Sequence, residues 1–285
     1  MSDVLVLVYG LVAGLAVALG LFVGLRRAPA EAGVLWRASA VGVLLFLLWD
    51  LLTHGFEPIS NAIEAMRDEI DGPEEIFTLA PLLLAGLVVG FGALAWQAAS
   101  SFLAYPGRDD EEAGPTYAPG PGAGAATGTS GLVAATRARR LALRASVGVG
   151  LHGALVGLAI GGNGGRHEIA FPILLAAGLG LLNVLEGRRL AALSTAGERP
   201  PALLALVGGA PVLVATAVGL WLANSTTVVA FQGIAAGALL YTVIRLLVAS
   251  GGREARPRLY AGVALGITVA FLANIAVIAF AGSID

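Results

Sequence analysis

The stretch "VLVLVYGLVAGLAVALGLFVGL" (residues 4–25) contains no charged side chain and no proline. A helix needs about 20 consecutive apolar residues to cross the hydrocarbon core of a bilayer, so this stretch is long enough to span a membrane. No basic region precedes it and no small-residue cleavage motif follows it, so we do not expect a cleavable signal peptide. The stretch is therefore interpreted as the first membrane-spanning helix.

The composition extends this interpretation to the whole chain. Hydrophobic residues make up 57% of the sequence and charged residues only 13%, whereas a soluble domain has about 25% charged residues. The apolar runs are continuous and do not alternate with period two, so they predict helices. Cysteine is absent, which excludes disulfides, thiolate metal sites and a cysteine nucleophile. The net charge of −2 gives no reason to expect a nucleic-acid partner.

Eight segments are long and apolar enough to cross a membrane. They predict an all-α integral membrane protein with one transmembrane domain over residues 1–285, embedded in a lipid bilayer. The spans are expected at residues 4–25, 36–56, 77–104, 141–162, 168–193, 202–223, 226–249 and 259–281.

The arginines decide the expected orientation of these spans. With eight spans, 15 of the 17 basic residues fall in or beside loops on one side, and only Arg67 and Arg166 fall on the other. Cytoplasmic loops carry the excess of basic residues in membrane proteins. We therefore expect a multi-pass protein of the cell (plasma) membrane with both termini outside.

Two loops differ from the others in composition. Residues 105–131 are rich in proline, glycine, alanine and threonine, which predicts a flexible cytoplasmic linker. Residues 57–75, "EPISNAIEAMRDEIDGPEE", are acidic and lie on the outer side. They are interpreted as a solvated loop or as a short amphipathic helix on the membrane surface. Their negative potential would concentrate cations at the mouth of a pathway.

Ionisable residues inside a bilayer are costly and mark candidate functional sites. Asp50, His152 and Glu186 are the ones expected at membrane depth. His54 and Glu57 lie near the outer end of the second span and could extend a pathway from Asp50.

His152 and Glu186 lie on two spans that a short connection joins, so these helices are expected to be antiparallel neighbours. Asn183 precedes Glu186 by three residues and so shares its face of the helix. His152 is either a neutral imidazole bonded between helices or a metal ligand. Glu186 pairs either with His152 or with Arg188 and Arg189 at the membrane surface. Arg245, toward the inner end of the seventh span, is expected to reach the surface.

These segments resemble those of the ZIP (Zrt/Irt-like) family of divalent-metal transporters. That family has eight spans, both termini outside and a variable cytoplasmic loop after the third span. Its fourth span carries H-N-x-P-E-G-L-A, beside "HGALVGLAIG" (152–161) here, and its fifth carries H-E-x-P-E-G, beside "LNVLEG" (182–187). The seventh span, "AAGALLYTVIRLL" (235–247), is similar to the family's A-A-G-A-x-L-Y run, and "LVGGAPVLVATAVG" (206–219) is similar to its G-x-x-E-P-x-G segment.

The resemblance implies a ZIP-like helix bundle that transports a divalent cation, zinc first, through a site between the fourth and fifth spans. The implied metal-site residues are His152, Glu186 and Asn183. Several family ligands are replaced, by Gly153, Val156, Leu182, Ala210 and Arg245. The remaining residues could hold one hydrated ion but not a two-metal cage. Metal and proton would compete for the site, and Val156→Glu, one turn from His152, is expected to tighten zinc binding.

Two other functions stay open at this stage. The chain could have lost metal transport and act as a scaffold, a regulator or a carrier of another solute. An intramembrane enzyme is not expected, because no span shows H-E-x-x-H, paired carboxylates or a serine–histidine arrangement. No resident cofactor is expected, and a homodimer is left open.

Overall fold

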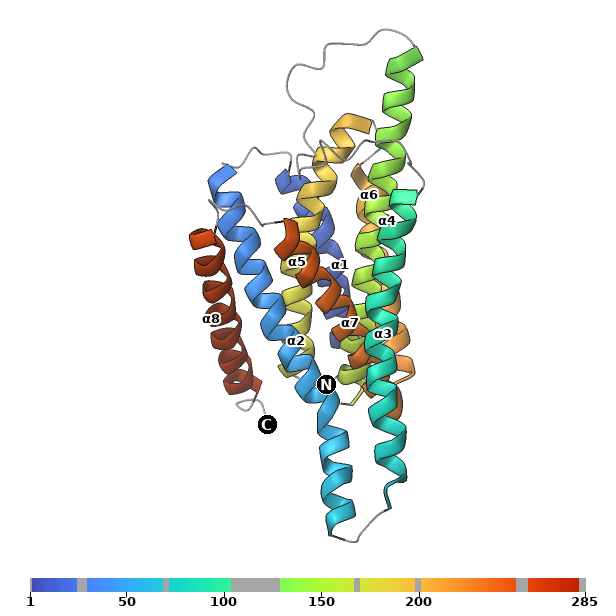
Figure 1. Cartoon of the computed structure of the whole chain (residues 1–285), viewed down its shortest axis with the longest axis vertical. Coiled ribbons are helices and arrows are strands. Elements are labelled where there is room, and N and C mark those ends of the chain that lie inside the picture. The colour runs from blue at the N-terminus through green and yellow to red at the C-terminus, as the bar shows by residue number, and fades with distance from the viewer. Residues whose placement is uncertain are drawn as a thin grey trace.

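The computed structural model describes residues 2–24, 30–68, 72–103, 129–166, 170–197, 201–249 and 256–281. These residues form eight α-helices and no strand (Figure 1). The helices are α1 (Asp3–Gly24), α2 (Ala30–Arg67), α3 (Glu74–Leu103), α4 (Thr129–Gly165), α5 (Ala170–Gly197), α6 (Pro201–Trp221), α7 (Ser225–Ala249) and α8 (Arg256–Ala281). All eight are long and apolar enough to cross a membrane. This confirms the expected all-α, eight-span class.

The interpretation of residues 57–75 as a loop is wrong for most of that segment, which is helical; the helix is a continuation of the second span and not a separate short element. Helix α2 continues through Pro58 to Arg67, and α3 begins at Glu74. The physical reason is a small apolar cluster in which Ile59 of α2 packs with Leu79 of α3 and with Val229 of α7. At about 1.5 Å per residue α2 measures roughly 57 Å, so its end extends with the start of α3 beyond the other helices (Figure 1).

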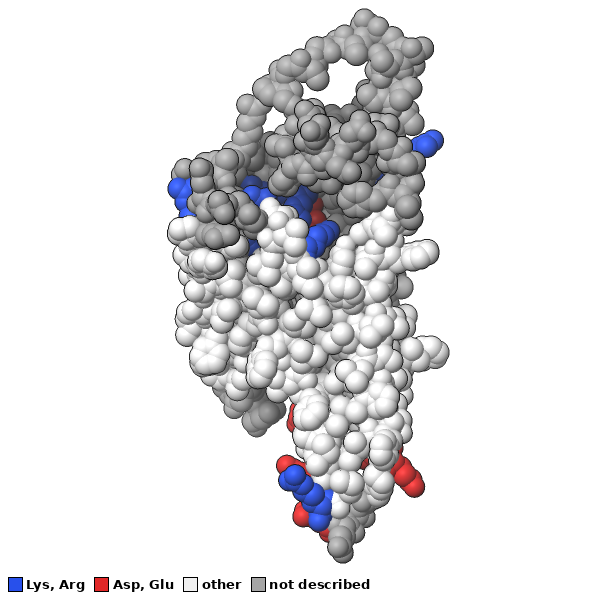
Figure 2. Space-filling view, in the orientation of Figure 1, with Lys and Arg blue, Asp and Glu red and all other residues white. Residues whose placement is uncertain are grey.

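The expected linker lies largely outside the described residues, which resume at Thr129. Helix α4 begins there, so the last three positions of the predicted linker are helical. Basic side chains gather mainly toward the end of the molecule at which α2, α4 and α8 begin, here called the arginine-rich end (Figure 1, Figure 2). Acidic side chains gather at the opposite end, here called the acidic end, where α2 finishes at Arg67 and α3 begins at Glu74 (Figure 2).

The helices group into two bundles. The first, called the α4–α5 bundle, consists of α1, α4, α5 and α6, where α4 packs mainly on α6 and α1 mainly on α5. The second, called the α2–α7 bundle, consists of α2, α3, α7 and α8, where α3 packs mainly on α7 and α2 on α8. Between the bundles the most extensive packing is that of α7 on α4, and α2 on α5 is weaker.

Glycines bring the helices within each bundle into backbone contact. A Cβ at Gly90 of α3 would overlap the carbonyl oxygen of Ile234 on α7, and one at Gly187 of α5 would overlap that of Val17 on α1. Helices in lipid associate through small residues that permit this close approach. Each bundle is therefore locked together backbone against backbone.

The boundary between the bundles is filled mainly by side chains. One large apolar cluster joins Leu44, Leu47 and Leu51 of α2 with Leu175 and Leu179 of α5. It includes Val156 and Ile160 of α4 and Leu239 of α7 as well. Most of this cluster lies toward the acidic end, which leaves a polar region nearer the arginine-rich end.

Candidate functional site

A small cavity of about 30 Å³ lies on the boundary between the bundles. Helices α4 and α5 contribute His152, Asn183 and Glu186 to its wall, so three residues singled out from the sequence meet there. Helices α3 and α7 complete the wall with Gln97, Tyr241, Thr242 and Arg245, among others. The volume suits about two water molecules, since one water needs about 10–15 Å³ on this scale.

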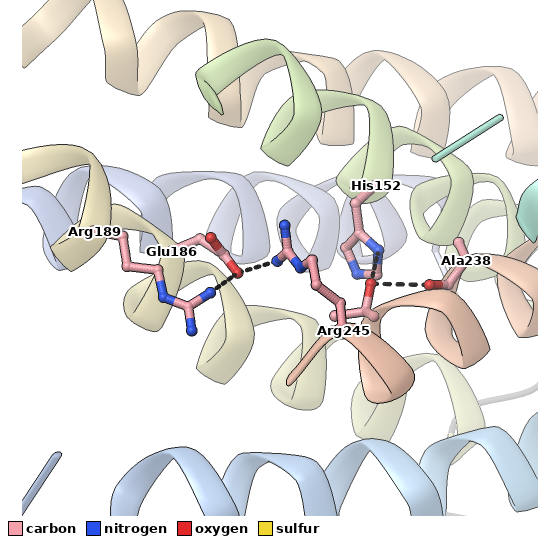
Figure 3. A network of polar contacts seen from close by, with 6 residues as sticks. His152, Glu186, Arg189, Ala238 and Arg245 are labelled. Atoms are coloured by element: carbon pink, nitrogen blue, oxygen red, sulfur yellow. Dashed lines mark hydrogen bonds and ion pairs between the residues drawn. The ribbon is translucent and has the colours of Figure 1, made fainter. Parts of the chain in front are cut away.

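His152 is held by a hydrogen bond across the boundary. Its Nδ1 atom lies 3.1 Å from the hydroxyl of Thr242, which in turn donates to the carbonyl of Ala238 at 2.9 Å (Figure 3). Because a carbonyl only accepts, the single hydroxyl proton is used there, and the Thr242 oxygen must accept from Nδ1–H. In the neutral ring the Nε2 atom then carries a lone pair, and it is buried without a hydrogen-bond partner.

Asn183 offers a second acceptor to the same cavity. Its amide nitrogen donates to the carbonyl of Ala13 on α1 at 2.7 Å, which fixes the side chain inside its own bundle. Its Oδ1 atom is buried and has no hydrogen-bond partner. Leaving a buried acceptor unpaired costs about 1–3 kcal/mol, so a site with two of them favours a ligand that donates hydrogen bonds or carries positive charge.

Glu186 supplies the carboxylate of the site, and two arginines hold it. Its Oε1 atom accepts from Nη1 of Arg189 at 2.8 Å and from Nη2 of Arg245. The guanidinium of Arg245 lies between the carboxylate and the His152 ring (Figure 3). The Glu186 side chain is 10% exposed, whereas those of Arg189 and Arg245 are 37% and 46% exposed. The ion pair therefore joins the cavity to the arginine-rich end of the molecule.

Arg245 and Thr242 are the residues that sequence reasoning missed. Arg245 was expected to reach the membrane surface, but it pairs with Glu186 of the other bundle. The sequence signal that could have found both residues is the spacing of Thr242 and Arg245, because residues three apart share one face of a helix. Glu186 was expected to pair either with His152 or with Arg188 and Arg189, and the structure shows the ion pair with Arg189.

The structure does not bring Asp50, His54 and Glu57 to this cavity. His54 Nδ1 lies 2.9 Å from the Asp50 carbonyl oxygen and 3.7 Å from its Oδ1. The His54 ring stacks on Phe171 of α5 with centroids 4.2 Å apart. Glu57 is exposed further along α2. These residues lie nearer the acidic end than the cavity does.

Val156 was expected to lie beside the metal site, one turn from His152, but it does not face the cavity. It is fully buried in the apolar cluster of the boundary and does not line the cavity. A glutamate there would bury a carboxylate among leucines and an isoleucine, so the position of Val156 does not support the expectation that Val156→Glu adds a metal ligand, and that expectation stays a prediction.

The chemistry of the site allows one cation with few ligands. The described part of the chain contains no group of three or more His, Cys, Asp or Glu side chains that could hold a metal ion. A cation in this cavity could use the His152 and Asn183 lone pairs, and it would reach the carboxylate only by competing with the arginines.

Comparison with known proteins gives no identification of this arrangement: no protein-family model matches the chain, and no curated protein matches its sequence.

Proposed function

We propose that the chain transports a divalent metal cation, with zinc as the first candidate, as its resemblance to the ZIP family implies. The observation that carries the proposal is the pair of buried acceptors without partners, His152 Nε2 and Asn183 Oδ1, at one cavity. Imidazole nitrogen and amide oxygen are ordinary ligands of small cations. Both belong to the α4–α5 bundle, as does Glu186, so a bound cation would travel with that bundle.

The place of the cavity supports transport over simple storage of an ion. It lies where two bundles meet, and sites of secondary transporters typically lie near the bilayer midplane between units that rock against each other. Weak binding by few ligands suits this role, because a transported ion must also leave.

In this proposal the arginine-rich end faces the cytoplasm of the cell (plasma) membrane and both termini are outside. The sequence has no cysteine, so single cysteines can report the side directly. Ser2→Cys is expected to react with an impermeant maleimide from outside, and Thr127→Cys only after the membrane is opened. Labelling of both from the same side would refute the orientation.

Zinc uptake into proteoliposomes tests the transport proposal. His152→Ala is expected to lower uptake at least about tenfold, because it removes a ligand from a site that has few. Ser146→Ala is the matched control, since Ser146 is equally buried on α4 but donates to the carbonyl of Leu204 within its own bundle at 2.6 Å. Uptake that is unchanged in His152→Ala, or absent from the wild type, would refute the proposal.

A specific observation favours a second function. Two guanidinium groups on one carboxylate leave little negative charge for a dication. A chain of this fold that carries another solute, or serves as a scaffold or regulator, would need no metal at this site. Absence of zinc binding in the wild type, with the protein well folded, would favour this second function.

A further inference from the structure

The contact between Arg245 and Glu186 crosses from one bundle to the other. Arg245 belongs to α7 of the α2–α7 bundle, and Glu186 belongs to α5 of the α4–α5 bundle. Arg189, by contrast, reaches the same Oε1 atom from the same helix as Glu186, one turn away. The carboxylate thus has one partner that always moves with it and one that does not.

We propose that Arg245 is a tethered competitor of the cation: it holds Glu186 when the site is empty, yields it when a cation binds, and expels the cation when it returns. This inference rests on the proposed transport function and names the residue that sets affinity and release. The guanidinium takes the position between the carboxylate and His152 where a cation shared by these groups would lie (Figure 3).

The electrostatic reason is that Arg245 and the cargo are positive charges that compete for one buried carboxylate. Glu186 keeps Arg189 as a partner in either state, and a carboxylate at membrane depth is stabilised further by a second cation. The Arg245 guanidinium takes that second place in the empty site. When cargo is bound, Glu186 and Arg245 no longer neutralise each other, so the returning arginine weakens the hold on the cargo.

Competition has a consequence that a merely structural ion pair would not have. Removing Arg245 should improve cation binding, because the carboxylate loses a competitor. The same change should slow release, so the maximal rate of transport should fall while the apparent KM also falls. Loss of a structural contact would instead weaken binding or leave it unchanged.

The experiment compares Arg245→Gln with Arg245→Lys and Arg189→Gln, all reconstituted in lipid and titrated with Zn²⁺. Arg245→Gln is expected to bind zinc at least about tenfold more tightly, with a lower KM and a lower maximal uptake rate. Arg245→Lys keeps the charge and should stay near the wild type. Arg189→Gln removes a charge from the same oxygen without touching the boundary, and should change affinity by no more than about threefold.

A second measurement uses the wild type, so that no folding defect can interfere with it. Phenylglyoxal modifies free guanidinium groups, and peptide mass spectrometry reads the modification at Arg245 with and without Zn²⁺. Modification should rise when zinc is added. Unchanged or lower modification at Arg245, or an Arg245→Gln variant that binds zinc no better than the wild type, would overturn the competition.

The two proposals can fail separately. If His152→Ala abolishes uptake but Arg245→Gln binds zinc as the wild type does, transport stands and the competition is refuted. If zinc binds only to Arg245→Gln, Arg245 blocks the site without yielding it, so both wild-type zinc transport and the reversible competition are refuted. If neither chain binds zinc, both proposals are refuted.

Discussion

The interior of each bundle and the boundary between the bundles are held by different kinds of contact. Inside the bundles, helices meet backbone to backbone at glycines such as Gly90 and Gly187. At the boundary, Gly148 and Gly162 of α4 face side chains, those of Gln97 and Phe231. A backbone contact can change only if a whole helix moves, whereas a side chain can change rotamer or partner. The difference predicts that, if the helices rearrange, each bundle moves as a unit and the contacts between the bundles change.

The polar contacts follow the same division. Helix α7 supplies a side-chain partner to α4 or α5 at three levels, through Gln232, Thr242 and Arg245. The contacts of Ser146 and Asn183, in contrast, end on backbone carbonyls of their own bundle. One helix of the α2–α7 bundle therefore carries exchangeable contacts along much of the boundary.

The largest effect is expected when a charge is placed in the apolar part of the boundary. Val156→Glu should lower the free energy of unfolding by several kcal/mol, because its carboxylate would be buried without a partner. Val156→Ala, which loses packing but adds no charge, should cost only about 1–3 kcal/mol. Thermal unfolding of the purified chains in detergent, followed by size exclusion, measures both.

The opposite result for Val156→Glu would be informative as well. Wild-type stability together with tighter zinc binding would mean that Val156 can reach the cavity. The boundary would then be wetter than its burial indicates.

Alanine at three glycines sharpens the comparison of interior with boundary. Gly90→Ala forces a Cβ against the Ile234 carbonyl of the same bundle and should cost about 1–3 kcal/mol. Gly178→Ala meets only the end of the Leu47 side chain across the boundary, which can move, so it should cost less. Gly92→Ala is the control, because a Cβ at Gly92 meets no atom within 4 Å. Equal losses for Gly90→Ala and Gly178→Ala would contradict the division into bundles.

Sequence reasoning recovers the fold class because the signal is local. Each span is a continuous apolar run, so its length and composition suffice to count eight helices. The convergence of His152, Asn183 and Glu186 on one cavity was also accessible, because a short connection joins their helices. These features depend on neighbours along the chain.

The partner of Glu186 and the place of Val156 depend on packing between distant helices, which the sequence alone does not supply. An arginine near a helix end can reach lipid headgroups or a buried carboxylate, and only the position of α7 beside α4 decides for Arg245. The helical continuation of residues 57–67 has the same origin, because Ile59 needs Leu79 and Val229 to be buried. The sequence alone left a solvated loop and a short amphipathic helix open for this segment, and neither joined it to the second span.

A smaller effect is expected at Thr242, where a neutral contact joins the bundles. Thr242→Val keeps the shape of the side chain but leaves Nδ1–H of His152 without an acceptor, which should cost about 1–2 kcal/mol. Thr216→Val is the matched control, because the Thr216 hydroxyl is equally buried but donates within its own helix to Val212 at 2.9 Å. Nitrogen NMR of His152 should show Nδ1 protonated in the wild type; protonation at Nε2 would contradict the hydrogen-bond assignment.

The smallest effect is expected nearest the acidic end, where Gln232 donates to Asn163 Oδ1 at 2.8 Å and keeps its own Oε1 buried without a partner. Gln232→Met breaks this bond but also removes the unpaired oxygen, so one unsatisfied acceptor replaces another and the stability change should stay within about 0.6 kcal/mol. Asn163→Leu instead leaves both polar atoms of Gln232 unpaired, so it should destabilise the chain more, by about 1–3 kcal/mol. Thermal unfolding of the two single variants and the double variant gives the coupling energy. If Gln232→Met destabilises as much as Asn163→Leu, Gln232 Oε1 has a partner such as bound water, and the boundary is polar along more of its length than these contacts indicate.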